Sequence, residues 1–432
     1  MEQSERLDLL IVGGGIGGVL CLKYAKAAGL SALLLERKSG VGGIWQDLPA
    51  WQDIQIARQD WTLGSVPIGG EDQASIRDNI QAWVDRFGLS PFIRLNTEVT
   101  SARPVATGWE AQTNDGFYRS RYLVAATGGH NRPRIPAVER IKSSIEECHS
   151  SGLRDASVLA AKDVVVVGGG ASAYDLLDLC FEHGAHRVTW VYRSLKWMRP
   201  TRRPKHTAAD GRRLARQQML GVPLATTNSL INRDLHIRYA KAGLQEILPD
   251  GTFDLRHHQL IPGRRRMIGN FSRIERYRGE IAALDGRTVR LLDGRSFQGD
   301  TLLWGTGYNL DLGFLDVGGL SGLNHLEDLE RRCGSLFLSR DAPNLSFLAP
   351  AVLETNNVST PWAYALACKS IVSHVRGADV FDDTPVSGHV NGFDLARFLA
   401  RRDRVSYPRG LWHPKFLYEL FCRPRHVPMP IP

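Results

Sequence analysis

The sequence has few cysteines, and none of them has the spacing of a disulfide framework, a redox pair or a metal site. Its six cysteines are scattered over 432 residues without a C-x-x-C pair. A small disulfide-stapled scaffold is therefore excluded. A dithiol reductase is excluded as well, because the sequence lacks the close cysteine pair that its chemistry needs. Scattered thiols are typical of reduced, structural cysteines, so we expect a cytoplasmic protein without a metal ion.

Long apolar runs are missing as well. The uncharged stretch at residues 9–22 is only 14 residues long and contains several glycines, whereas a membrane span needs roughly 18 or more apolar residues. The mostly acidic residues before this stretch do not fit a secretory signal. We therefore expect a soluble protein with no membrane partner.

Positive charge is in excess, but it is concentrated in one place. The chain carries 54 Lys and Arg against 45 Asp and Glu, a net charge of +9. Residues 193–216 alone hold nine Lys and Arg and one Asp, so the rest of the chain is close to neutral. A local excess favours a segment that faces phosphate over a general nucleic-acid surface, and we expect no nucleic-acid partner.

Glycine is abundant, with 43 residues, and it is clustered. The apolar run at residues 7–12 leads into GGGIGG at 13–18 and then into an amphipathic stretch, which predicts a strand, a tight turn and a helix. The same pattern recurs about 155 residues later, where DVVVV at 163–167 leads into GGGASA at 168–173. The chain thus contains two openings of the kind that begins a dinucleotide-binding domain.

The two openings differ in the charge that follows their second strand. In the first, Glu36 stands about 20 residues after the glycines, where a carboxylate can accept hydrogen bonds from ribose hydroxyls. In the second, Arg193 stands in the matching place and suits a ribose that bears a 2′-phosphate, a task that Lys196 or Arg199 could share. FAD in the first half and NADPH in the second is the simplest assignment, although a solvent-exposed Arg193 stays open.

Later segments complete the two halves. Asp115-Gly116 and Asp293-Gly294 predict hairpin turns before closing strands at 122–129 and 301–308. The Pro-rich segment at 131–136 predicts a crossing between the halves.

We therefore predict an α/β fold with two Rossmann-like dinucleotide-binding domains, one for FAD and one for NADPH, the second inserted into the first. The predicted boundaries place the FAD domain at residues 1–157 and 305–432 and the NADPH domain at 158–304, with a basic insertion around 195–262.

Taken together, these motifs resemble the class B flavoprotein monooxygenases, the group that contains flavin-containing and Baeyer–Villiger monooxygenases. Besides the two fingerprints, the matching pieces are GGIW at 42–45, ATG at 126–128 followed by Pro133 and Pro136, RSLKW at 193–197 and GTGY at 305–308. The resemblance covers most of the chain and implies bound FAD and NADPH. The cofactor-binding residues that we predict are Gly13, Gly15, Ile16, Gly18, Glu36, Arg37, Gly43, Ile44, Trp45, Thr127, Gly128, Gly168, Gly169, Gly170, Ser172, Arg193 and Ser194.

The resemblance also implies an activity. NADPH would reduce FAD, the reduced flavin would capture O2 as a C4a-peroxide or hydroperoxide, and one oxygen atom would pass to a small organic substrate by N- or S-oxygenation or Baeyer–Villiger oxidation. Arg58 and Gln59 are candidates for a catalytic role beside the flavin. An NADPH oxidase, or another flavin-dependent NADPH oxidoreductase, is the alternative, and the sequence leaves a homodimer open.

Three segments stand apart from these motifs. In the family's linker fingerprint Phe-x-Gly-x-x-x-His, this sequence has Ser143 in place of the Phe and Ile145 in place of the Gly, and keeps only His149. His149 is either an ordinary linker residue or one that serves movement between the cofactor domains. Residues 53–61 contain no asparagine, unlike amine- and sulfur-oxidising members. The basic run GRRRMIG at 263–269 is interpreted as a solvated loop or turn.

Overall fold

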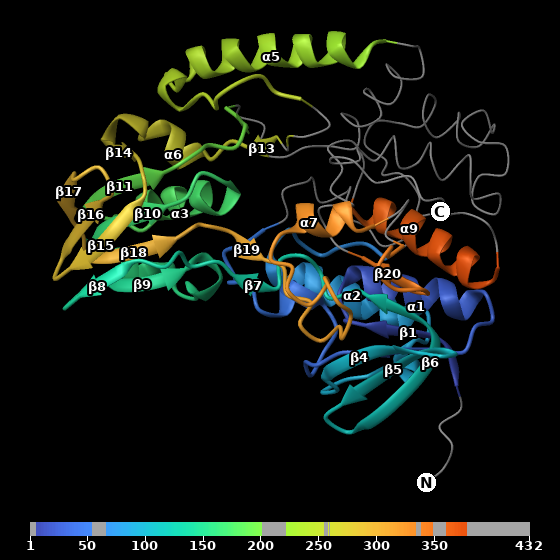
Figure 1. The fold of residues 1–432 in the computed structure, drawn as a ribbon. Helices are drawn as coiled ribbons and strands as arrows, with labels where there is room; N and C mark the ends of the chain where they lie inside the picture. The colour runs from blue at the N-terminus through green and yellow to red at the C-terminus, as the bar shows by residue number, and fades with distance from the viewer. Residues whose placement is uncertain are drawn as a thin grey trace.

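A computed structural model describes residues 6–53, 66–200, 222–254, 258, 260–333, 338–348 and 360–377. Within these ranges the chain forms two α/β units, each built around its own sheet (Figure 1). Arg58, Gln59 and the basic stretch beyond Pro200 lie outside the described residues.

The first unit is a mixed sheet whose parallel strands carry the first glycine fingerprint. The strands run in the order β3-β2-β1-β6-β5-β4, with β20 beside the second half of β6. They are β1 (Leu7–Val12), β2 (Ala32–Leu35), β3 (Ile93–Arg94), β4 (Val99–Val105), β5 (Gly108–Thr113), β6 (Gly116–Ala125) and β20 (Leu345–Phe347). All four residues of β2 are buried, as expected of a parallel strand that is covered on both faces.

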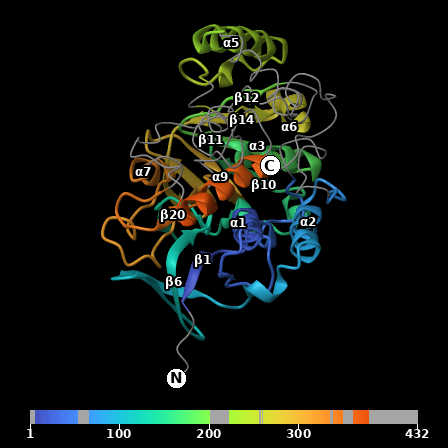
Figure 2. The ribbon, with the colours of Figure 1, turned by 90° about the vertical axis from the view of Figure 1, so that its right-hand side faces the viewer.

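Helices bring the far end of the described chain beside the first fingerprint. This unit contains α1 (Ile16–Ala27), α2 (Gln73–Arg86), α7 (Leu326–Arg331) and α9 (Thr360–Val375), with the 3-10 helices η1 (Gly43–Gln46) and η3 (Ser90–Phe92). α9 packs along α1, as Figure 1 and Figure 2 both show. Ala365 and Ile371 of α9 are fully buried in the same core as Val19 and Leu20 of α1.

The second unit is built on a parallel sheet in the order β14-β11-β10-β18-β9. Its strands are β9 (Glu146–His149), β10 (Asp163–Val167), β11 (Arg187–Tyr192), β14 (Ile274–Arg278) and β18 (Thr301–Trp304). Val164 and Val166 face a core that includes Leu176 of the helix α3, whereas Val165 faces a second core that includes Leu284. Because side chains alternate along a strand, β10 is apolar on both faces and is covered on both.

Smaller elements surround that sheet. The sheet over one face is β17-β16-β15-β8, made of β8 (Glu139–Ile141), β15 (Ile281–Asp285), β16 (Thr288–Leu291) and β17 (Ser296–Gln298). The helices are α3 (Ala171–Glu182), α5 (Leu224–Lys241), α6 (Arg265–Gly269), η4 (Ser150–Gly152), η5 (Ala156–Leu159), η6 (Gln245–Ile247) and η7 (Phe271–Arg273). Two short pairs complete the described strands: β12 (Met198–Arg199) with β13 (Ile261–Pro262), and β7 (Arg132–Pro133) with β19 (Tyr308–Asn309).

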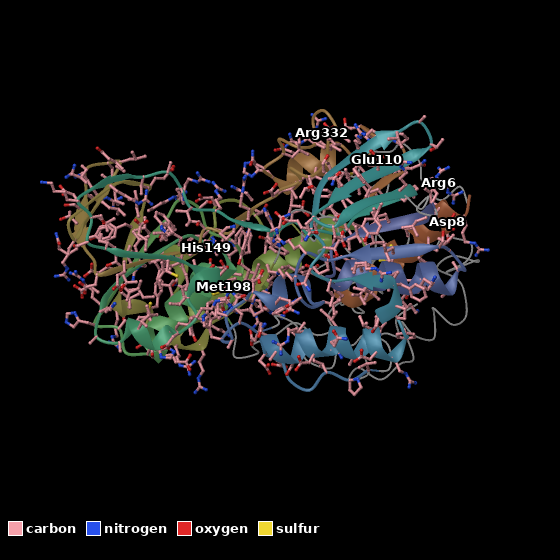
Figure 3. The ribbon with its side chains drawn as sticks, turned by 90° about the horizontal axis from the view of Figure 1, so that it is seen from below. Arg6, Asp8, Glu110, His149, Met198 and Arg332 are labelled. Atoms are coloured by element: carbon pink, nitrogen blue, oxygen red, sulfur yellow. The ribbon has the colours of Figure 1, made fainter. Side chains whose placement is uncertain are left out.

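The second unit is inserted into the first. β6 and β20 are neighbours in the first sheet, and every strand of the second sheet lies between them in sequence. The predicted fold class, two Rossmann-like units with the second inserted, is therefore confirmed (Figure 3 shows His149 and Met198 in one unit, and Asp8 and Glu110 in the other). The exact domain boundaries stay a prediction. Because β9 pairs with β18 of the second sheet, the structure favours a passage of the chain from the first unit to the second before Glu146.

Both predicted hairpins are present. β5 and β6 are antiparallel and turn at Asn114 and Asp115, with Thr113 opposite Gly116. β16 and β17 are antiparallel as well, and the Gly294 N–H donates to the Leu291 carbonyl in the turn between them. Within the described ranges, no helix has both the length and the apolar character that a bilayer crossing requires.

Candidate functional site

A cavity of about 1670 Å³ lies where the carboxyl ends of the central strands of both units meet. Both glycine fingerprints, the crossing at 129–138 and the turn after β18 line it. In doubly wound folds this edge of the sheet is where ligands bind. A typical small-molecule site has roughly 300–1,000 Å³, so the cavity has room for more than one such ligand.

The first fingerprint forms a tight turn between β1 and α1. A β-carbon at position 18 would lie 1.9 Å from the Gly13 carbonyl oxygen, so only glycine permits this contact between helix and turn. Gly13, Gly15 and Ile16 line the cavity, whereas Gly18 lies behind them in the packing of the turn. The local geometry is therefore the one that a G-x-G-x-x-G sequence predicts.

The helices that follow both fingerprints begin without a side-chain cap. α1 starts after Gly15 and α3 after Gly170, and no described side chain accepts a hydrogen bond from the first turn of either helix. In α2, by contrast, the Asp72 carboxylate caps the Ser75 N–H at 2.9 Å. Uncapped N–H groups and the helix dipole attract an anion, so both helix ends are suited to a pyrophosphate.

Glu36 is held at the edge of the cavity. It is buried, and its carboxylate accepts hydrogen bonds from the backbone N–H groups of Gly14 and Lys38, the second at 2.9 Å. These bonds fix the carboxylate beside the fingerprint turn, where a ribose bound there would meet it.

The loop after β2 closes over the first fingerprint. Gly43 has φ +58°, and a β-carbon there would lie 2.8 Å from the Gly15 Cα, so the loop can approach the fingerprint only with glycine at this position. Ile44 and Trp45 follow in η1 and line the cavity. The Trp45 carbonyl accepts a hydrogen bond from the Gln73 side chain of α2, which holds η1 in place.

The second fingerprint packs against the segment after β11. A β-carbon at position 169 would lie 1.9 Å from the Ser194 carbonyl oxygen, and the Gly169 carbonyl accepts from the Lys196 N–H at 2.7 Å. This packing brings Arg193 to the cavity wall, with its side chain 64% exposed and 3.9 Å from the Glu280 carboxylate. A long, exposed ion pair of this kind is weak, so Arg193 is available to a phosphate.

The crossing between the units is tied to the turn after β18. The Arg134 N–H donates to the Gly307 carbonyl at 2.9 Å, and the Thr306 hydroxyl donates to the Arg134 carbonyl. His149 contacts the same Gly307 carbonyl through Nε2 at 2.9 Å and the Ser151 hydroxyl through Nδ1 at 2.8 Å. Burial lowers the pKa of His149, so the ring is neutral at physiological pH and serves as a structural bridge.

A buried ion pair that the sequence did not indicate lies on the second unit's side of the cavity. Arg264 forms a salt bridge with Asp175 of α3, and both side chains are largely buried. Burial raises the pKa of Asp175, and Arg264 opposes that rise. The interpretation of GRRRMIG as a solvated loop or turn is therefore wrong for this residue: α6 docks on α3, and Arg266 also pairs with Asp178.

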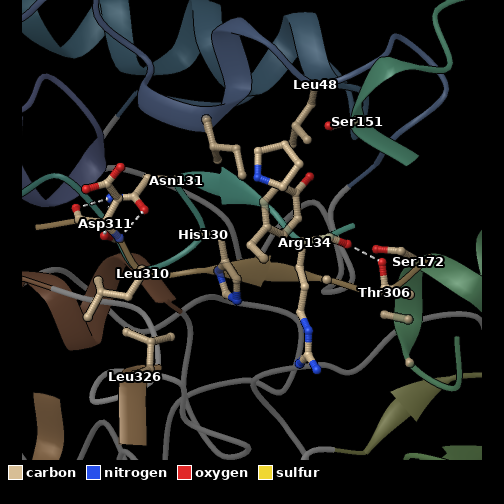
Figure 4. A pocket seen from close by; sticks show the side chains of 18 of the residues that line it. Leu48, His130, Asn131, Arg134, Ser151, Ser172, Thr306, Leu310, Asp311 and Leu326 are labelled. Carbon is tan, nitrogen blue, oxygen red and sulfur yellow. Dashed lines mark hydrogen bonds between the residues drawn. The ribbon is translucent and has the colours of Figure 1, made fainter. Parts of the chain in front are cut away.

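The structure brings the predicted cofactor residues together. All of them except Gly18 line the one cavity described above: Gly13, Gly15, Ile16, Glu36, Arg37, Gly43, Ile44, Trp45, Thr127, Gly128, Gly168, Gly169, Gly170, Ser172, Arg193 and Ser194. Figure 4 shows further lining side chains that the sequence did not single out, among them His130, Arg134 and Thr306. Arg134 and Thr306 stand inside the motifs that predict the crossing and the second closing strand.

Two cysteines far apart in sequence meet in the core. Cys21 of α1 and Cys368 of α9 are fully buried and contact each other, which the sequence spacing could not show. No cysteine of the described ranges lines the cavity, and burial holds the pKa of Cys368 well above its usual value. The pair is therefore inert packing and not a redox centre. No group of metal-ligating side chains occurs among the described residues.

Comparisons with known proteins agree with this geometry. The family described as pyridine nucleotide-disulphide oxidoreductase matches residues 10–213. An uncharacterized oxidoreductase, CzcO, from Bacillus subtilis is 28% identical over 190 residues, which are 43% of this chain and 54% of that protein. The FAD-binding monooxygenase VdtE from Byssochlamys spectabilis is 29% identical over 212 residues, 44% of this chain and 36% of its own length. The chain thus spans about half the length, or less, of these curated relatives.

A solved structure, OTEMO in complex with FAD and NADP, shares the fold over most of the chain. It has a TM-score of 0.65 at 16% identity and covers 87% of this chain and 86% of its own. The likeness shows that the two proteins share an architecture of two α/β units. Together with the monooxygenase relative, it confirms the resemblance to flavoprotein monooxygenases that the motifs indicate.

Proposed function

We propose that the protein is an FAD- and NADPH-dependent monooxygenase that inserts one oxygen atom from O2 into a small organic substrate. One observation carries the proposal: two uncapped helix ends, with a carboxylate beside one and a guanidinium beside the other, face a single cavity. The relative named as an FAD-binding monooxygenase and the structure with FAD and NADP support it.

The first unit is suited to FAD. The N-terminus of α1 would hold the pyrophosphate, and the buried Glu36 carboxylate would accept from the ribose hydroxyls. The loop at Gly43–Gln46 and the Thr127-Gly128 pair would enclose the rest of the cofactor, because both line the cavity next to the fingerprint.

The second unit is suited to NADPH. The N-terminus of α3 would hold its pyrophosphate, with Ser172 in the first turn. Arg193 would pair with the 2′-phosphate in preference to its weak partner Glu280, because a phosphate accepts charge-assisted hydrogen bonds from a guanidinium. NADH lacks this phosphate, so the site favours NADPH.

Bound together, the two cofactors would supply hydride transfer and the activation of O2, so the chain needs no catalytic triad. The chain's own residues bind, orient and shield. The bond from the Arg134 N–H to the Gly307 carbonyl fixes the crossing against the turn after β18, which sets the separation of the two binding sites, and the bond from His149 holds that turn against β9 within the second unit. We place the reaction in the cytoplasm, with a small molecule and O2 as partners, and N-oxygenation, S-oxygenation and Baeyer–Villiger oxidation as its possible forms.

Turnover under ¹⁸O2 tests this proposal. The FAD-loaded protein is given NADPH and a panel of ketones, amines and sulfides, and products are analysed by mass spectrometry. We expect substrate-stimulated NADPH consumption and a product that carries one ¹⁸O atom. Hydrogen peroxide equal to the NADPH consumed, with no labelled product from any substrate, would instead identify an NADPH oxidase.

A further inference from the structure

An arginine in the cavity wall carries a charge that nothing in the described part of the chain compensates. Arg134 is half-buried and lines the cavity. Among the described residues, no carboxylate lies within ion-pair distance of its guanidinium, and only its backbone N–H and carbonyl form hydrogen bonds. The guanidinium donors therefore face the cavity without a described carboxylate, and an anionic ligand there would be bound by charge-assisted hydrogen bonds.

The backbone of Arg134 is fixed in advance. Its N–H donates to Gly307, its carbonyl accepts from Thr306, and the preceding residues Arg132–Pro133 pair with Tyr308–Asn309. The guanidinium is therefore presented from a rigid anchor, which reduces the entropy lost when it binds a ligand. Figure 4 shows the side chains of His130 and Arg134 extending in the same direction from this anchor, into the pocket.

The position of Arg134 separates it from the groups suited to the cofactors. Lys38 is already paired with Asp47, and Arg193 stands at the strand end where the 2′-phosphate is expected. Arg134 instead lies on the crossing, between the two fingerprints. The reacting ends of two dinucleotides that start from opposite fingerprints would meet in this middle part of the cavity.

The pocket that the Arg134 side chain enters is mixed in character, with apolar surface as well as this charge, which fits a small organic acid. Leu310 and Leu326 line the same pocket and offer apolar surface, and the His130 ring stands edge-on to Tyr308 with ring centres 5.6 Å apart. One planar guanidinium matches one carboxylate in a bidentate manner, and the apolar walls suit an aliphatic or aromatic body.

We propose that Arg134 binds the carboxylate of the substrate, and that the substrate is a carboxylic acid with an apolar body. The role of this acid as a substrate rests on the proposed monooxygenase function, whereas the binding of an organic acid by Arg134 does not. Arg134 is thus a specificity-determining residue that orients the acid by its charged end and leaves its apolar part toward the middle of the cavity.

Binding measurements on the full-length, FAD-loaded protein test this inference. The dissociation constants of phenylacetate and hexanoate, and of their neutral amides, are measured by calorimetry for the unaltered protein and for R134Q. A charge-assisted hydrogen bond is worth about 1.5–3 kcal/mol, so R134Q should weaken the acids roughly 10- to 150-fold and leave the amides unchanged. R134K should restore part of the affinity.

Arg132 provides the matched control. It lies two residues away on the same crossing and is exposed, it donates to the Asn324 side chain, and it does not line the cavity. R132Q removes the same charge from the same loop, so acid binding should be unchanged. Because the Arg134 guanidinium has no described side-chain partner, R134Q should keep the melting temperature of the unaltered protein.

Two results would overturn the inference. The first is that the acids bind the unaltered protein no better than their amides, or bind R134Q equally well. The second is that R134Q weakens NADP+ instead of the acids, which would assign Arg134 to a cofactor phosphate. Failure of NADPH to reduce the bound flavin is a separate measurement, and it would remove the proposed function without touching acid binding.

Discussion

The variant Gly170→Ala tests cofactor binding at the second fingerprint without disturbing the fold there. Gly170 has φ −113° and ψ −169°, a backbone conformation that alanine adopts freely, and the nearest atom to an added β-carbon is Lys196 Cγ at 4.0 Å. The protein itself therefore has room for the methyl group. We expect the free energy of unfolding to stay the same or to rise by about 0.4–1 kcal/mol, because alanine restricts the unfolded chain.

The expected loss lies entirely in cofactor binding. Position 170 is where the backbone must approach the pyrophosphate, so a methyl group there holds the phosphates away from the uncapped N–H groups of α3. Loss of one charge-assisted hydrogen bond costs about 1.5–3 kcal/mol, which is roughly a 10- to 150-fold rise in the dissociation constant of NADP+. Calorimetry measures that constant, and thermal denaturation measures the stability.

Two further variants complete the experiment. Gly15→Ala is the counterpart in the first unit, since the nearest atom is Gly43 Cα at 3.5 Å, and it should lower FAD content while leaving stability unchanged. Gly169→Ala should lower the melting temperature, because its β-carbon would lie 1.9 Å from the Ser194 carbonyl oxygen. If Gly170→Ala binds NADP+ as tightly as the unaltered protein, the pyrophosphate does not bind at α3 and the reasoning fails.

The remaining predictions concern single charged or titrating groups. Arg193→Ser should reduce the preference for NADPH over NADH about tenfold in kcat/KM, a modest effect because the side chain is 64% exposed. Glu36→Gln leaves one of two backbone N–H groups without an acceptor, so it should lower the stability by about 1–3 kcal/mol in denaturant titrations and should also lower FAD content. Burial depresses the pKa of His149 below its usual 6.5, so the contribution of the neutral ring to stability is complete above pH 6.5. That contribution declines as the pH falls, because the unfolded chain takes up a proton that the folded chain does not. Between pH 7 and pH 5 the melting temperature of His149→Gln should therefore fall less than that of the unaltered protein.

Local patterns allowed the framework of the site to be predicted from sequence. Gly18 contacts Gly13, and the hairpin turn at Asp115 joins two neighbouring strands. Both features involve residues only a few positions apart, so glycine spacing and turn residues predict them directly. The charges at Glu36 and Arg193 follow strands whose register the fingerprint sets, and both reach the cavity.

Features that depend on distant packing could not be predicted in this way. Arg264 looked solvated because its run is basic, but α6 docks on α3 and buries it against Asp175, 89 residues away. The contact between Cys21 and Cys368 requires α9 to return to α1. Arg134 stood in a Pro-rich connector, and its importance comes from the absence of a described partner, which no sequence pattern expresses.

Anaerobic addition of NADPH to the FAD-loaded protein tests the central claim most directly, namely that two cofactors meet in the cavity between the units. We expect the visible absorbance of the bound flavin to bleach as NADPH reduces it, and to bleach much faster with NADPH than with NADH. Bound flavin that keeps its oxidised spectrum in the presence of saturating NADPH would contradict the account.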